Sequence, residues 1–166
     1  MRHFRALPLL AVAVGLAAFV AGTAVAAAPK PKTVTFKGHY AGQVTEKVNG
    51  TDVAALTTGT GTGTVIGKGK LTGTVTASTA NPPCSPIAGK GWLTGAKGKL
   101  KVTVLPTSRG CAASADDQNN ITVSGTVKVA GGTLLFRKAK GSIHFSGAYD
   151  RTSGAFSIKL TGKLTY

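Results

Sequence analysis

Side chains of two kinds alternate along most of the chain beyond residue 33. Between residues 34 and 44 the even positions hold Val, Phe, Gly, Tyr, Gly and Val, whereas the odd positions are mostly Thr, Lys, His and Gln. A period of two residues places successive side chains on opposite faces of a β-strand. No segment carries the i, i+3, i+4, i+7 apolar spacing of an amphipathic helix. The sequence therefore predicts an all-β fold.

The alternation, read from end to end, predicts about eight strands in an antiparallel meander. Closing the meander into a single barrel removes two exposed edges, so we expect a β-barrel, with a β-sandwich as the alternative. Between the second and third strands we expect a three-residue loop at 67–69, because a two-residue loop would turn lysines onto the apolar side. The expected strands lie near 33–47, 53–66, 70–78, 90–94, 99–105, 121–129, 141–149 and 155–165.

Residues 1–26 have the features of a secretory signal peptide. A short segment with two arginines precedes an apolar stretch, and Ala24-Val25-Ala26 supplies an A-x-A cleavage pattern. The alternative is an uncleaved membrane anchor, since a span needs about 20 apolar residues. We expect cleavage, because the stretch is rich in alanine and only weakly hydrophobic. The predicted protein is therefore secreted, with no transmembrane span after processing.

The exported part contains two cysteines, Cys84 and Cys111. An even pair in an exported protein predicts a structural disulfide, which the chain-entropy treatment values at about 3–4 kcal/mol. We expect it to tie together two irregular stretches, 79–89 and 106–120.

Beyond the signal, residues 27–32 are expected to form a flexible lead-in and residues 33–166 a single barrel domain.

The chain is strongly basic, with 20 Lys and Arg against 5 Asp and Glu and a formal net charge of +15. Such a charge favours encounters with polyanions, including nucleic acid, acidic glycopolymers and anionic lipid headgroups. The alternative is a solvated surface that keeps a secreted protein soluble, because the lysines are spread along the chain. No feature indicates a specific nucleic-acid partner. The candidate polyanion-binding residues are Lys68, Lys70, Lys97, Lys99, Lys101, Lys138 and Lys140.

Residue types that carry catalysis are sparse and separated. The acidic residues lie in or beside expected turns, so no facing pair of carboxylates for acid–base work is evident; they are Glu46, Asp52, Asp116, Asp117 and Asp150. His39 and His144 fall on the polar side of their strands, and two isolated histidines do not supply the three or four ligands of a zinc site. We therefore expect no metal, no cofactor and no catalytic residue.

Large aromatic side chains mostly share the apolar side, where an ordinary core is the simpler interpretation. The competing hypothesis is that the glycine-rich face of 59–73 leaves a cavity lined by Tyr40, Trp92 and Tyr149. Eight-stranded barrels either fill themselves or hold one small ligand. We therefore predict a non-catalytic binding protein, for a small apolar ligand inside the barrel or a polyanion on the basic surface. The oligomeric state is left open.

The segment 131–141, GGTLLFRKAKG, resembles the pattern GGTGxFxxAxG of the allene oxide cyclase and dirigent barrel superfamily, with Leu134 where a glycine is usual. The whole exported part also looks like a group of uncharacterised secreted proteins from high-GC Gram-positive bacteria. The superfamily resemblance implies an eight-stranded barrel. It also implies an alternative function, isomerising reactive oxylipins or steering the coupling of phenolic radicals, although the polar groups of those activities find no clear counterpart on the strands.

Overall fold

The structure is a computed structural model that describes residues 30–80, 82–114 and 116–166. The predicted signal peptide, and the lead-in up to residue 29, lie outside the described residues. Eight strands and one short 3-10 helix, η1, make up the fold. They are β1 (Thr33–Asn49), β2 (Asp52–Gly63), β3 (Gly67–Ser78), β4 (Cys84–Gly95), β5 (Gly98–Ala112), β6 (Asn120–Gly132), η1 (Leu134–Phe136), β7 (Lys140–Asp150) and β8 (Ala155–Thr165). None of the helical structure in the described ranges has the length and apolar character needed to cross a bilayer.

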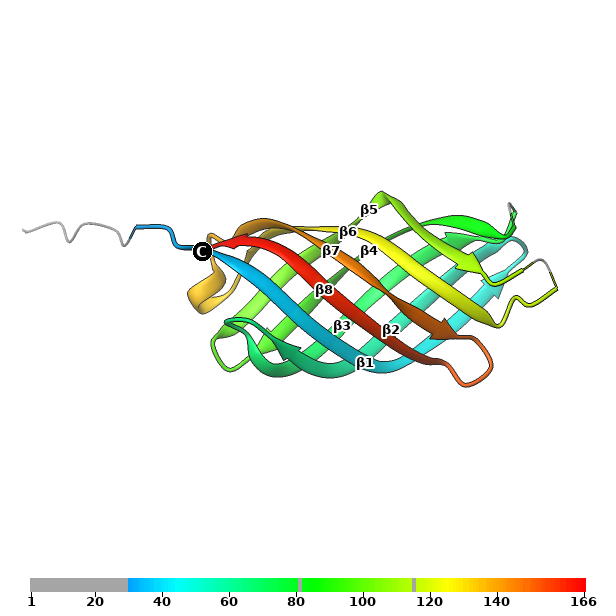
Figure 1. The fold of residues 1–166 in the computed structure, drawn as a ribbon, viewed down its shortest axis with the longest axis horizontal. Coiled ribbons are helices and arrows are strands. Elements are labelled where there is room, and N and C mark those ends of the chain that lie inside the picture. The colour runs from blue at the N-terminus through cyan, green and yellow to red at the C-terminus, as the bar shows by residue number, and fades with distance from the viewer. Residues whose placement is uncertain (1–29, 81, 115) are drawn as a thin grey trace, which may run out of the picture. The chain divides into compact units, whose positions relative to one another are not determined.

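The strands form one closed antiparallel barrel in sequence order (Figure 1). Each strand pairs with its neighbours in the chain, and β1 closes the barrel on β8, from Thr33 opposite Thr165 to Gln43 opposite Ala155. The predicted barrel is confirmed, and the alternative of a β-sandwich is wrong. Closure leaves no unpaired edge, which is the expected benefit for an all-β chain.

The β2–β3 turn has the predicted length but a different place. Gly63 pairs with Gly67, so the turn is 64–66 rather than 67–69. An odd loop length keeps odd positions on one face of both strands, as expected. The shift carries Ile66 into the turn, where its side chain is 2% exposed. Burial of this isoleucine at the end of the barrel explains why the turn forms three residues earlier.

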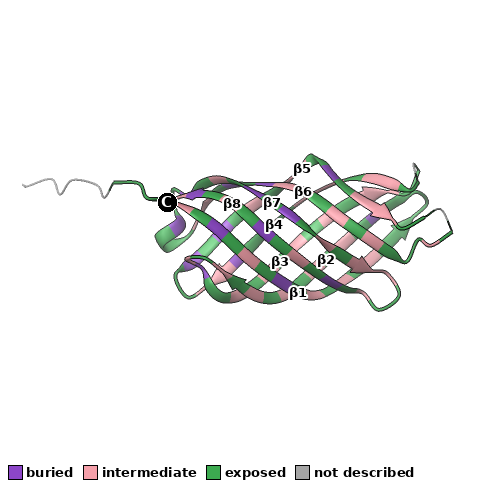
Figure 2. Cartoon of the chain, viewed as in Figure 1, coloured by how far each residue is buried: buried purple, intermediate pink, exposed green. Residues whose placement is uncertain are grey.

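The barrel has two unlike ends, which we name by their contents. The closed end carries the β2–β3 and β4–β5 turns, η1, the start of β1 and the end of β8; the open end carries the other four connections. Figure 2 shows buried residues gathered toward the closed end and intermediate ones toward the open end. The side chains buried there to 2% exposure or less include Phe36, Leu93, Leu100, Phe136, Ile143 and Leu164.

Glycines on β2 make room for aromatic rings from the adjoining part of the barrel. A Cβ at Gly61 would lie 2.7 Å from Cδ1 of Tyr40, and one at Gly63 would lie 2.8 Å from Cζ of Phe36. Gly59 meets the ring of Phe156 at the same 2.8 Å distance. The glycine face of β2 is therefore filled by aromatic rings, and this part of it is not the cavity considered from the sequence.

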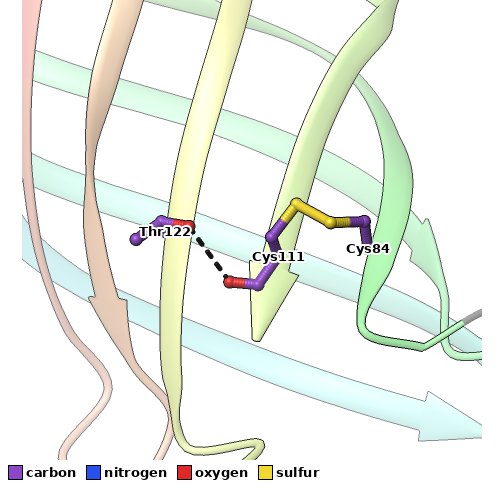
Figure 3. Close-up of a disulfide and its surroundings, with 3 residues drawn as sticks. All are labelled: Cys84, Cys111 and Thr122. Carbon is purple, nitrogen blue, oxygen red and sulfur yellow. Dashed lines mark hydrogen bonds between the residues drawn. A yellow bond between two sulfur atoms is a disulfide. The ribbon is translucent and has the colours of Figure 1, made fainter. Parts of the chain in front are cut away.

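The disulfide Cys84–Cys111 is confirmed, but it joins strands rather than loops. Cys84 opens β4 and stands opposite Cys111 near the end of β5. Figure 3 shows the bridge beside β6, where Thr122 Oγ1 donates to the carbonyl oxygen of Cys111 at 3.2 Å. Much of 79–89 and 106–120 is strand, because both segments pair along the open half of the barrel.

Strand β5 contains two more residues than its neighbours over one stretch. Pairing with β6 shifts between Val104 and Arg109, and pairing with β4 shifts at the same level. Ser108 closes the gap: its Oγ accepts from Thr126 N at 3.1 Å and donates to Thr126 O at 3.4 Å. A fully buried hydroxyl with both bonds made replaces the missing ladder bonds of the bulge.

Candidate binding cavity

The open half of the barrel is hollow. A cavity of about 260 Å³ is lined by side chains from all eight strands. Many of the inward-facing aliphatic side chains around it are only partly buried, although they pack against the core. They include Leu71, Ile87, Val102, Val104, Val123 and Ile158. In a filled barrel these inward-facing side chains would be fully buried, so their remaining exposure to solvent indicates that this half of the barrel is not filled.

Small residues on the inner face explain why this half is not filled. Val75 on β3 stands between Ala55 on β2 and Gly89 on β4 in the strand register. Gly110 and Ala112 continue the same face along β5 and line the cavity. Side-chain volume decides whether an eight-stranded barrel fills itself or holds one small ligand. Glycine, alanine and valine at these positions leave the space.

A polar cluster lies at the mouth of the cavity. Arg151, in the β7–β8 turn, donates from Nε and Nη2 to Oε2 of Glu46 on β1, each at 3.2 Å. Both side chains line the cavity and are only 25% and 20% exposed. The turn itself is held by Asp150, whose Oδ1 accepts from the backbone of Thr152 at 2.8 Å. A mainly apolar cavity, lined by aliphatic and aromatic side chains with some threonines and serines, therefore opens past this ion pair.

Tyr149 on β7 completes this mouth cluster of Glu46, Tyr149 and Arg151. Burial, the negative charge of Glu46 and a hydrogen bond to Glu46 raise the pKa of Tyr149 to about 12, whereas the charge of Arg151 acts in the opposite direction. The phenol is consequently neutral at physiological pH and keeps its proton for hydrogen bonding. The cluster offers a carboxylate, a guanidinium and a hydroxyl to the polar end of a bound molecule.

The three aromatic residues expected to line a cavity occupy three different places. Tyr149 lines it. Tyr40 is fully buried between the cavity and the closed end, and burial raises its pKa to about 12. Trp92 is 37% exposed on the outside of the barrel, because its neighbours Gly91 and Leu93 face the cavity. The placement of Trp92 inside was therefore wrong, since its even position on β4 is the polar side.

Glu46 is the cavity residue that sequence reasoning missed. It was expected in or beside a turn, at the end of the strand predicted over 33–47, but β1 extends to Asn49 and Glu46 lies within it. Its even position places it on the same inner face as Tyr40 and Val44. The sequence did contain a clue, because Glu46 shares its even position with the apolar residues of the same strand. The cation that balances it, Arg151, could not be found by that route because it lies in a turn.

The fold gathers the candidate polyanion-binding lysines at the closed end. All seven are exposed and lie in the β2–β3 or β4–β5 hairpin, between η1 and β7, or at the first residue of β7. The five acidic residues of the chain instead lie at the open end: Glu46 at the mouth, and Asp52, Asp116, Asp117 and Asp150 in or beside its connections. Lysines that are scattered in sequence thus form one basic end, opposite an end that holds the acidic residues.

The histidines lie on the outer face, at the positions expected from their alternation. His39 Nε2 is 3.1 Å from Ser157 Oγ, and His144 Nδ1 is 3.0 Å from Thr126 Oγ1. Asp117 binds the backbone and side chain of Asn120, and these hydrogen bonds lower its pKa. Across the part of the chain that the structure describes, no three His, Cys, Asp or Glu residues are grouped to hold a metal ion.

Fold and cavity together define a closed eight-stranded antiparallel barrel that is filled at one end and hollow at the other. Comparison of the chain with protein-family models, with curated proteins and with solved structures finds no match.

Proposed function

We propose that this is an exported, non-catalytic protein that binds a small, mainly apolar molecule in the open half of its barrel. The observation that carries the proposal is the cavity of about 260 Å³, lined mainly by apolar side chains and opening past the ion pair of Glu46 and Arg151. Ligand sites are typically concave and apolar, with a few polar groups that orient the ligand. The mouth cluster supplies these groups.

The fit of the cavity sets the class of ligand. A cavity of this volume suits a compact molecule with one or two rings or a short acyl chain, because sites for larger ligands commonly reach several hundred Å³ or more. An apolar body would contact Val75, Val104 and Val123. A polar group at one end would meet Glu46, Tyr149 or Arg151 at the mouth.

Binding of a neutral two-ring fluorescent probe, 6-propionyl-2-(dimethylamino)naphthalene, tests the proposal. We expect saturable enhancement of fluorescence at one site per chain. Val75→Trp fills the cavity, since the flanking Ala55 and Gly89 leave room for the ring, and should abolish the signal. Leu56→Trp is the matched control on the outer face, where Leu56 is 54% exposed, and should bind as the parent does. Unchanged binding by Val75→Trp would overturn the proposal.

Export is proposed together with this function. Its support is the signal-like segment 1–26 and the disulfide, because disulfides persist mainly in oxidising compartments. Mass spectrometry of the protein collected outside the expressing cell tests both points. We expect an N-terminus at Ala27 and a mass two hydrogens below that of the reduced chain. A chain retained in the cytoplasm with an intact N-terminus would contradict export.

Catalysis of the allene oxide cyclase or dirigent kind is a second candidate, favoured by the mouth cluster and by the GGTLLFRKAKG segment. Leu134 occupies the glycine position of that motif and has φ 50°, the left-handed conformation that glycine favours. Phe136 and Ala139 of the same motif are fully buried at the closed end. Chiral chromatography of phenolic coupling products formed with a one-electron oxidant tests this. Racemic products with and without the protein would remove the radical-coupling form of the idea.

A further inference from the structure

Two consecutive leucines protrude from the closed end. Leu134 is 69% exposed and Leu135 is 48% exposed, whereas Phe136, the next residue, is completely buried. The ring of Phe136 packs edge-on against Tyr166, with centroids 5.7 Å apart, and fills the end of the barrel. The core therefore uses Phe136 and leaves the two leucines in water. Contiguous exposed apolar side chains that are rimmed by polar residues mark sites of interaction with proteins or membranes.

The leucines are held in place by the backbone of neighbouring segments. Leu135 N donates to Lys97 O at 3.4 Å, and Phe136 N donates to Thr133 O at 2.9 Å. On the other side, Lys99 N donates to Thr133 Oγ1 at 3.1 Å. Leu134 also keeps φ 50°, a conformation that costs a non-glycine residue free energy. A fixed tip that exposes apolar side chains at the expense of strain is not explained by packing.

Basic side chains surround this tip. Lys97 and Lys99 flank it through the backbone bonds just described, and the chain after η1 adds three more cations. All are exposed: Lys97, Lys99, Arg137, Lys138 and Lys140. The five acidic residues of the chain lie at the opposite end of the barrel, so their charges do not neutralise this group. The tip is therefore an apolar pair within a positive ring.

We propose that the closed end docks on the surface of a bilayer that contains anionic lipids. Leu134 and Leu135 enter the boundary between headgroups and acyl chains, and the five basic residues contact lipid phosphates. A weak apolar anchor alone gives marginal, reversible binding, and stable attachment takes a second signal such as a polybasic patch. The tip carries both signals. A soluble polyanion would use the lysines but would have no hydrocarbon to receive the leucines, which is why a bilayer is the favoured partner.

Docking in this way leaves the ligand cavity free. The closed end and the mouth cluster lie at opposite ends of the strands, so a barrel attached by η1 presents its mouth away from the membrane. This inference stands on the closed end alone and does not depend on the proposed ligand binding.

Flotation with vesicles tests the docking surface. The protein is mixed with phosphatidylcholine vesicles that either contain or lack phosphatidylglycerol. The same form of the protein, processed or full-length, is used in every sample. We expect binding only to the anionic vesicles. Raising the salt from about 0.1 M to about 1 M shortens the screening length from about 10 Å to about 3 Å and should release most of the protein. Each neutralised basic residue of the ring should lower the partition coefficient about fivefold.

Leucine variants separate bilayer docking from plain charge attraction. L134S/L135S should lower the partition coefficient about tenfold or more, because apolar burial is lost while the charge is unchanged. Leu56→Ser removes a comparably exposed leucine from the outer face of β2, and Lys47→Gln removes a cation near the open end; both should bind as the parent does. Parent-like binding by L134S/L135S would overturn the proposal, because charge attraction alone would then account for the attachment.

A second measurement, tryptophan fluorescence, does not require the double variant to fold. In a Trp92→Phe background, Leu135→Trp places one tryptophan at the tip, and its emission should shift to the blue with anionic vesicles. Leu56→Trp in the same background should show no shift. An unshifted Leu135→Trp spectrum on vesicles that carry the bound protein would mean that the tip stays in water and would overturn the proposal.

Discussion

Glu46 and Arg151 are separated by 105 residues in the sequence, and their side chains meet at the mouth of the barrel with Nη2 3.2 Å from Oε2. Each is only partly exposed, so each neutralises a charge that would otherwise face an apolar cavity. Such a pair contributes little net stability near a surface. Its effect is local: it holds a carboxylate beside the phenol of Tyr149 and sets how that phenol titrates.

Replacing Glu46 by Gln should lower the pKa of Tyr149 from about 12 toward 10.0. The shift should be partial, because burial is the largest cause and persists, whereas the charge and the hydrogen bond of Glu46 are removed. Arg151→Gln is the control of opposite sign, since loss of the cation should raise this pKa further. Phenolate absorbance during an alkaline titration measures both. A fall of the same size in both variants would contradict the assigned roles.

Tyr40→Phe should stabilise the protein. The Tyr40 hydroxyl is buried and, among the described residues, has no hydrogen-bond partner. An unsatisfied buried hydroxyl costs about 1–3 kcal/mol, so we expect a gain of about 1 kcal/mol at neutral pH.

The gain should grow in alkali. Burial raises the pKa of Tyr40 from 10.0 to about 12, so between these values the folded protein keeps a proton that the unfolded chain releases. Stability is therefore lost as the pH rises through that window, and the phenylalanine variant does not incur this loss. Urea unfolding at neutral pH and near pH 11 measures the effect. A destabilised Tyr40→Phe would show that the hydroxyl is bonded, for example to an ordered water.

Much of the fold was predictable because one periodicity governs it. Alternation of apolar and polar residues alone determines which face of each strand points inward, and short connections make neighbouring strands pair. The register in which neighbouring strands pair was harder to predict from the sequence. The β2–β3 turn shifted to 64–66 because burial of Ile66 outweighed the turn preference of Gly67-Lys68-Gly69. Local glycine preference and distant packing competed there, and the sequence shows only the first.

The candidate site was only partly predictable. Tyr149 could be assigned to the inner face, and Glu46 could have been by the same parity. Trp92 was misplaced because its size suggested the interior, although residues at even positions of this part of β4 point outward. The hollow volume depends on the summed size of side chains from all eight strands, and the gathering of lysines depends on how hairpins meet at one end. Neither property belongs to any one segment of sequence.

Gly61→Ala should destabilise the barrel strongly. Its Cβ would lie 2.7 Å from Cδ1 of Tyr40 and would also clash with the carbonyl oxygen of His39. Overpacking costs about 1–3 kcal/mol, and a fixed backbone atom cannot move aside cheaply, so we expect a loss of about 3 kcal/mol. Gly110→Ala is the matched control, because its nearest contact would be an ordinary 3.5 Å. It should change stability by less than about 0.5 kcal/mol. Equal losses in denaturant unfolding would refute the close-approach explanation.

Removing the disulfide should weaken the open end before the closed end. The bridge joins β4 and β5 beyond the bulge at Ser108, where their pairing has been interrupted. Cys84→Ala/Cys111→Ala should cost about 3 kcal/mol of stability. In hydrogen exchange, amides near Ile87 and Gly110 should lose protection before those near Leu93 and Leu100. Uniform loss of protection along β4 and β5 would contradict this local role.

Leu134→Gly should stabilise the protein while weakening its attachment to membranes. Leu134 has φ 50°, which glycine adopts without a steric penalty, so we expect a gain of about 1 kcal/mol in denaturant unfolding. Leu135 has no such constraint, and Leu135→Gly should instead lose about 0.5–1 kcal/mol through backbone entropy. Both variants should bind anionic vesicles less well than the parent. Opposite changes in stability with the same loss of vesicle binding would show that the strained conformation of Leu134 costs stability while its side chain serves membrane attachment. A Leu134→Gly variant that is more stable and still binds vesicles as the parent does would contradict this role of the strained leucine.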